Sequence, residues 1–139
     1  MKKYLLDTSA LLTLRDDEPG AQRVAELLAL AQNRKCECSA CFMSQMEMMY
    51  RVWRDESEGK ANLAYQQCLA LPITWIHETP ELLKAAASIK ARHPLSVANA
   101  WIAASTELAG ATLVHKDPEF SAADIEQEIL PSKAKKTNR

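Results

Sequence analysis

Short apolar segments alternate with segments of helical periodicity along almost the whole sequence, and this alternation constrains the fold most. The apolar segments are residues 3–6, 36–42, 73–76 and 112–115. Strands that are apolar at nearly every position are typical of a parallel sheet, because helices bury both of its faces. We therefore predict one α/β domain over residues 1–130, built on a central parallel sheet.

Local signals place several helix ends. Ser44 and Glu47 match a capping box that opens a helix after the second strand. Ser96 is expected to cap a later helix, and Gly110 stands where a left-handed residue would end it. Residues 125–130 fit the period of a strand as well as that of a helix, so they are predicted as either.

Charge and hydropathy limit the classes of protein that fit. The chain has 17 basic and 18 acidic residues, and its net charge is -1. Residues 131–139 carry four positive charges and no acid, so the rest of the chain has a charge near -5. Such a body is not a typical electrostatic binder of nucleic acid, and we expect the basic tail to be disordered. With no run of 18 apolar residues and no signal peptide, we expect a cytoplasmic protein that does not contact a membrane.

The four cysteines are expected to be reduced thiols in such a compartment. Cys36, Cys38 and Cys41 are close together in the sequence, but structural zinc needs a second pair at recognisable spacing. Cys68 stands alone, with no histidine near it. We therefore interpret the cysteines as small buried residues in and around a strand.

Acidic residues follow three of the predicted strands. Asp7 ends the first strand, Glu47 lies just inside the helix after the second, and Asp117 comes two residues after the strand that ends at His115. Each has a local alternative: Asp7 can cap a helix, Glu47 can complete the capping box, and Asp117 can form a turn before Pro118. Together they indicate a cleft at the carboxyl ends of the strands, where Mg²⁺ or Mn²⁺ would offset the repulsion between carboxylates.

Four segments of the chain resemble, in order and spacing, the signature segments of PIN-domain ribonucleases, and in particular the VapC-type toxins of toxin–antitoxin pairs. The segments are residues 5–12 (LLDTSALL), 44–47 (SQME), 95–104 (LSVANAWIAA) and 111–120 (ATLVHKDPEF). The resemblance covers the chain to about residue 130. It implies a three-layer α/β/α sandwich with a central parallel sheet and a metal-dependent hydrolysis of RNA phosphodiester bonds.

The same resemblance assigns roles to individual residues. Asp7 would ligate Mg²⁺ or Mn²⁺, Glu47 and Asp117 would hold the metal or its waters, and Thr8 or Ser9 would support these acids. The fourth position departs from the family pattern, because Asn99 stands where an aspartate is usual. An amide oxygen can ligate a metal but brings no charge, so weaker metal binding and slower hydrolysis are expected.

Partners follow from the resemblance as well: an RNA substrate, a cognate antitoxin that obstructs the cleft, and a second copy of the chain in a homodimer. Arg51, Arg54 and Lys60 are candidates to line a cleft for the RNA backbone, although a solvated helix face explains them equally well. His93 and His115 are interpreted as ordinary loop and strand-end residues.

Other functions remain open on the sequence. The first is a catalytically silent module of the same fold that binds an antitoxin or RNA. The second is a phosphatase-like domain with Asp7 as the nucleophile, but that chemistry usually places an acid two residues later, where this chain has Ser9. A phospho-receiver domain would need an adjacent acid pair near the first strand, whereas Asp16 and Asp17 lie in a later loop.

Overall fold

The computed structural model describes residues 1–132 and places one five-stranded parallel sheet in them. The strands lie in the order β3-β2-β1-β4-β5, so β1 occupies the centre between β2 and β4. Their bounds are Lys3–Leu6 for β1, Glu37–Cys41 for β2, Thr74–Ile76 for β3, Thr112–His115 for β4 and Gln127–Ile129 for β5. The predicted parallel sheet is confirmed, and residues 125–130 contain a strand.

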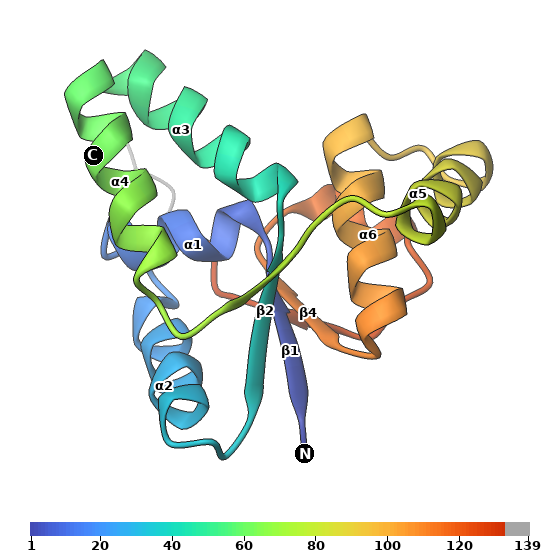
Figure 1. Ribbon diagram of the computed structural model, residues 1–139, viewed down its shortest axis with the longest axis horizontal. Coiled ribbons are helices and arrows are strands. Elements are labelled where there is room, and N and C mark those ends of the chain that lie inside the picture. Colours follow the sequence, from blue (N-terminus) through green and yellow to red (C-terminus); the bar gives the residue numbers. More distant parts are fainter. Residues whose placement is uncertain (133–139) are drawn as a thin grey trace, which may run out of the picture.

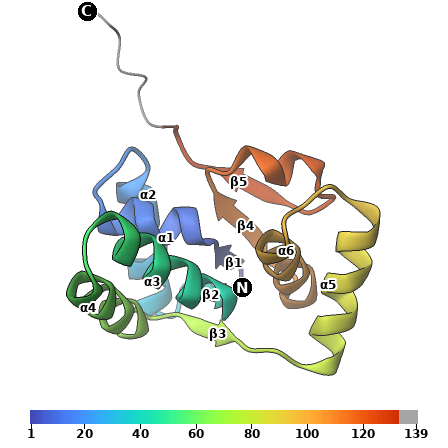
Figure 2. The same cartoon turned by 90° about the horizontal axis from the view of Figure 1, so that it is seen from above.

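Helices cover both faces of the sheet, which gives the three layers that were expected (Figure 1). Helices α1 to α4 lie on one side, whereas α5 and α6 lie on the other, and Figure 2 shows the same separation from above. The helices are α1 (Thr8–Arg15), α2 (Ala21–Gln32), α3 (Met43–Asp55), α4 (Glu58–Leu69), α5 (Pro80–Arg92) and α6 (Val97–Ala109); a short 3₁₀ helix, η1 (Pro118–Ala122), follows β4.

Successive residues of the central strands enter opposite cores, because side chains alternate across a strand. Leu6 and Val114 belong to the core under α1 to α4, whereas Leu5 and Leu113 belong to the core under α5 and α6. All four side chains are fully buried. This double burial explains why the strands are apolar at consecutive positions rather than at alternate ones.

The capping signals are confirmed for α6 and wrong for α3. Ser96 accepts a hydrogen bond from the backbone N–H of Asn99, and Gly110 ends the helix at φ +62°. In contrast, α3 begins at Met43, one residue before the predicted cap, and Phe42 precedes it without a side-chain capping bond. Ser44 is instead buried inside the helix, so the capping box is not formed.

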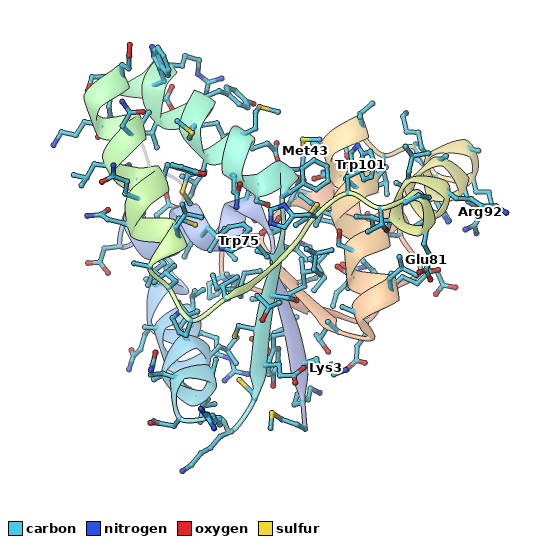
Figure 3. All side chains as sticks on the ribbon, viewed as in Figure 1. Lys3, Met43, Trp75, Glu81, Arg92 and Trp101 are labelled. Atoms are coloured by element: carbon cyan, nitrogen blue, oxygen red, sulfur yellow. The ribbon has the colours of Figure 1, made fainter. Side chains whose placement is uncertain are left out.

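Edge-to-face packing joins the start of α3 to α6 at the carboxyl end of the sheet. The rings of Phe42 and Trp101 lie 5.2 Å apart at 74°, and Figure 3 shows Met43 beside Trp101 at this junction. Such contacts between aromatic rings favour a fixed separation of the elements that carry them. The two helix layers are therefore held at a defined distance on either side of β1.

The cysteines are free and buried, as expected, and the thiols of Cys36 and Cys38 both contact the carbonyl of Leu27. In the described part of the chain, none of the helices has the length and hydropathy that a membrane span requires. The prediction of a disordered basic tail concerns residues 131–139, and from residue 133 onward these lie outside the described part.

Candidate functional site

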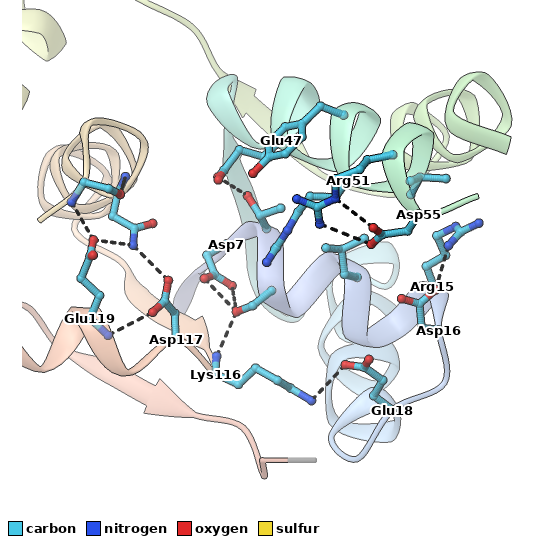
Figure 4. Close-up of a pocket in the computed structure, with 18 of the residues that line it drawn as sticks. Asp7, Arg15, Asp16, Glu18, Glu47, Arg51, Asp55, Lys116, Asp117 and Glu119 are labelled. Carbon is cyan, nitrogen blue, oxygen red and sulfur yellow. Dashed lines mark hydrogen bonds and ion pairs between the residues drawn. The ribbon is translucent and has the colours of Figure 1, made fainter. Parts of the chain in front are cut away.

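A cavity of about 560 Å³ lies at the carboxyl ends of β1 and β4. The chain leaves β1 toward β2 on one side of the sheet and returns on the other side through β4, so this is the point where the strand order reverses. Ligand sites of parallel sheets form at such points. All four predicted site residues line this cavity: Asp7, Glu47, Asn99 and Asp117 (Figure 4).

Asp7 joins the end of β1 to the start of α1 and is held by three hydrogen bonds. Its Oδ1 atom accepts from the backbone N–H of Ala10 at 2.8 Å, and the Ser9 hydroxyl lies 2.7 and 2.8 Å from the two carboxylate oxygens. Ser9 also accepts from the backbone N–H of Lys116 at 3.0 Å. Asp7 is thus a helix cap as well as a cavity residue, and the two interpretations of its role are compatible.

The pKa of Asp7 is raised to about 7, because its carboxyl group is buried away from water. The hydrogen bonds from Ser9 and Ala10 oppose this rise, whereas the negative charges of Asp117 and Glu47 add to it. Asp7 therefore lies close enough to Asp117 and to Glu47 for their charges to oppose its ionisation, and a bound cation would relieve this effect.

Glu47 reaches the same cavity from α3. Its Oε1 atom lies 2.8 Å from the hydroxyl of Thr8, and the same hydroxyl lies 2.9 Å from that of Ser44. An ionised carboxylate only accepts hydrogen bonds, so Thr8 donates to Glu47 and leaves Ser44 to donate to Thr8. Glu47 and Ser44 are therefore linked through α1 rather than by the local capping box that the sequence indicated.

Asp117 is positioned by the residues on both sides of it. Its Oδ1 atom accepts from the backbone N–H of Glu119 at 3.0 Å, and its own N–H donates to Nδ1 of His115 at 3.0 Å. His115 Nε2 lies 2.8 Å from Gln127 Oε1, so both ring nitrogens are engaged. Burial lowers the pKa of His115. His115 is thus a buried residue at the end of β4 with both ring nitrogens in hydrogen bonds.

Glu119 belongs to the site, although the sequence did not single it out. Its Oε1 atom accepts from the backbone N–H of Ser96 at 2.7 Å and from the amide Nδ2 of Asn99 at 2.9 Å. These two donors lower the pKa of Glu119, the backbone N–H of Ser96 having the larger effect. Its place within segment 111–120 was visible in the sequence, but its contact with the start of α6 depends on the tertiary fold.

Arginines line the other end of the cavity. Arg51 and Arg54 of α3 contribute as predicted, and Arg15 of α1 joins them, whereas Lys60 does not line the cavity. The guanidinium group of Arg15 forms a bidentate ion pair with the carboxylate of Glu56, with N–O distances of 2.7 and 3.1 Å. The cavity therefore has an acidic end over β1 and β4, whereas the end between α1 and α3 carries three arginines together with Asp16, Asp55 and Glu56.

The donor set fits a hard divalent cation. Carboxylate and amide oxygens are the side-chain ligands that Mg²⁺ and Mn²⁺ accept, and the four predicted residues present only these. Among residues 1–132, however, no three His, Cys, Asp or Glu side chains are grouped tightly enough to hold one ion as they stand.

Comparison with known proteins connects the chain to one family. Residues 4–126 match the sequence profile of the PIN domain. A search of curated proteins finds no match.

Solved structures with the same fold include toxin–antitoxin proteins. The chain is 15% identical to a chain of VapBC2 from Rickettsia felis bound to a promoter DNA fragment, with a TM-score of 0.74 over 93% of this chain and 99% of that one. The chain is also 15% identical to a chain of DNA-bound VapBC from Salmonella typhimurium, with a TM-score of 0.72 over 93% of this chain and 98% of that one. A third structure is VapC20 from Mycobacterium tuberculosis, described as a toxin that cleaves the sarcin-ricin loop. It is 20% identical to this chain, with a TM-score of 0.70 over 92% of this chain and 99% of that one. At these identities the likeness establishes a shared fold.

Proposed function

The chain belongs to the PIN domain family, and on this premise we propose that it is a divalent-metal-dependent endoribonuclease that acts as the toxin of a toxin–antitoxin pair. One observation carries the proposal: Asp7, Glu47, Asn99 and Asp117 come from four separate elements and line one cavity. A sarcin-ricin loop cleaving toxin among proteins of the same fold supports RNA as the substrate. We assign this activity to a single domain, residues 1–130.

Asp7, Glu47, Asn99 and Asp117 would hold Mg²⁺ or Mn²⁺ through their side-chain oxygens. When bound, such an ion lowers the pKa of a water molecule and stabilises the charge that develops on a phosphodiester. The role of the protein is to fix the oxygens that face the substrate. The hydrogen bonds of Ser9 and Ala10 orient the Asp7 carboxylate, and the Thr8 hydroxyl orients Glu47.

The arginines at the end of the cavity between α1 and α3 would bind the RNA backbone. Arg15 and Arg54 are both paired with acids, at Glu56 and Asp55 respectively. Arg51 forms no hydrogen bond or ion pair within 4.0 Å in the described part of the chain and interacts with Asp55 only at longer range, so of the three arginines it is the most available to a phosphate. RNA that bridges the two ends would place a phosphodiester over Asp7.

Replacing Arg51 with alanine is expected to weaken the binding of a fluorescent single-stranded RNA about 3- to 10-fold, because one phosphate contact is lost. The salt dependence should fall with it, by roughly 0.7 in the slope of log K against log salt concentration. Fluorescence anisotropy in EDTA measures both quantities without cleavage. Arg92→Ala is the matched control, because it removes the same charge from α5, away from the cavity (Figure 3). Equal losses for both variants would contradict the assignment of Arg51.

An antitoxin is the proposed protein partner, and a homodimer the proposed assembly. Solved structures with this fold include VapBC complexes, which supports the first. An apolar surface is available on α3, where Met46, Tyr50 and Trp53 are about half exposed. Exposed apolar side chains at helical spacing are typical of a face that another chain covers.

A silent module that binds an antitoxin or RNA is the second candidate function. The observation that favours it concerns the Asn99 side chain, whose amide nitrogen donates hydrogen bonds to two carboxylates of the site, Asp117 and Glu119. Asn99 also leaves the four-residue set with three negative charges where the family usually has four. In this case the cavity would persist as a binding surface without hydrolysis.

Incubation of total RNA with the protein separates the two functions. We expect products of discrete length with Mn²⁺ and none with EDTA, and faster cleavage after Asn99→Asp, because the added carboxylate strengthens metal binding. Equal cleavage by both forms would remove Asn99 from the mechanism. An absence of cleavage by both forms, with each shown to be folded by circular dichroism, would favour the silent module.

A further inference from the structure

The side-chain amide of Asn99 joins two carboxylates that come from a different part of the chain. Its Nδ2 atom lies 3.0 Å from Asp117 Oδ2 and 2.9 Å from Glu119 Oε1. Asn99 is 8% exposed, whereas Asp117 and Glu119 are partly exposed, so these contacts are partly shielded from water. Because ionised carboxylates only accept hydrogen bonds, the NH₂ group and not the amide oxygen must face them.

Backbone N–H groups complete this arrangement. The N–H of Glu119 donates to Asp117 at 3.0 Å, and the N–H of Ser96 donates to Glu119 at 2.7 Å. The hydroxyl of Ser96 in turn accepts from the backbone N–H of Asn99 at 3.2 Å. Two neighbouring carboxylates are thus surrounded by four N–H donations, two of them from the same amide group.

We propose that Asn99 takes the place of a cation in assembling this side of the cavity, so that Asp117 and Glu119 are held together before any metal binds. Glu119 is then a positioning residue that acts through Asn99 and Ser96, and not a ligand of its own. The proposal deepens the proposed function, because it concerns the same site. What the proposal says of the metal-free protein, however, does not depend on RNA cleavage.

An aspartate at position 99 would repel Asp117 and Glu119, whereas the Asn99 amide attracts them. A carboxylate there has no N–H to give, so three negative groups would meet at the start of α6 and around η1 with only the backbone N–H groups of Ser96 and Glu119 as donors. Repulsion of this kind is relieved by protonation or by a bound cation. The carboxylates of such a variant would therefore be held together only by a metal, whereas Asp117 and Glu119 of this chain are held together without one.

The test is thermal unfolding in EDTA and in Mn²⁺, which needs no RNA. In EDTA we expect Asn99→Asp to unfold about 5–10 °C below the unchanged protein, since Asp117 and Glu119 each lose the amide donor and meet a third negative charge instead. Mn²⁺ should raise the Tm of Asn99→Asp clearly more than that of the unchanged protein. Asn62→Asp, an exposed site on α4, is the matched control and should shift by less than about 2 °C in either condition.

A second substitution keeps the proposal testable if Asn99→Asp does not fold in EDTA. Adding Glu119→Gln returns an amide donor to the pair, so the double variant should recover at least half of the lost Tm in EDTA. The proposal is overturned if Asn99→Asp matches the unchanged protein in EDTA, if Mn²⁺ stabilises both equally, or if Glu119→Gln recovers nothing. A protein that passes these tests but cleaves no RNA would contradict the proposed nuclease and leave this inference intact.

Discussion

Asp7→Asn should reduce RNA cleavage at least about 100-fold while leaving the protein folded. Asp7 is 2% exposed and lies at the centre of the acidic end of the cavity, where it interacts electrostatically with both Asp117 and Glu47. The substitution removes the negative charge that would hold a divalent ion but retains an oxygen that can cap α1, because asparagine is as good a capping residue as aspartate. Cleavage of a defined RNA in Mn²⁺, followed over time by gel electrophoresis, gives the rate.

Two comparisons separate a lost ligand from a damaged fold. Asp124→Asn makes the same chemical change at an exposed position that does not line the cavity, and its cleavage rate should change less than about 2-fold. The Tm of Asp7→Asn in EDTA should equal or exceed that of the unchanged protein, because a buried charge beside two others has been removed. Cleavage at an undiminished rate by Asp7→Asn would show that the cavity is not the active site.

Phe120→Ala should lower the free energy of unfolding by about 3–5 kcal/mol, the usual cost of emptying a buried aromatic site. Phe120 is fully buried among the core residues under α5 and α6, and its ring lies 4.9 Å from that of His115. A loss of this size is a large part of the total stability of an ordinary domain. Urea denaturation followed by tryptophan fluorescence measures it.

Leu83→Ala is the control for this experiment, because Leu83 is 50% exposed on α5 and its truncation should cost less than about 1 kcal/mol. Phe120 also anchors η1, whose residues lie between Asp117 and the strand β5, and its carbonyl accepts from Gln127 at 2.8 Å. Cleavage should therefore fall together with stability. A Phe120→Ala protein as stable as Leu83→Ala would mean that the core closes around the missing ring.

The architecture was largely predictable because local and global preferences agree in this chain. Leu5 and Leu6 are both apolar because both faces of β1 are covered, and that pattern is visible without coordinates. Ser96 and Gly110 act on their own neighbours, so the ends of α6 followed from the sequence as well. Ser44 shows where such reasoning fails: its hydroxyl has a partner on α1 that a local motif cannot reveal, and that contact displaced the expected cap.

The same distinction applies to the site. By itself the sequence determined that Asp7 and Asp117 follow strands of a parallel sheet and therefore lie at the same edge, because strands that alternate with helices run in one direction. Only the tertiary structure decided that the amide of Asn99 faces Asp117 and Glu119, that Arg51 rather than Lys60 lines the cavity, and that Thr8 holds Glu47. These hydrogen bonds join side chains that lie 18 to 39 residues apart in the chain, and each requires its two atoms to be within about 3 Å of each other. Sequence spacing does not predict positions to that precision.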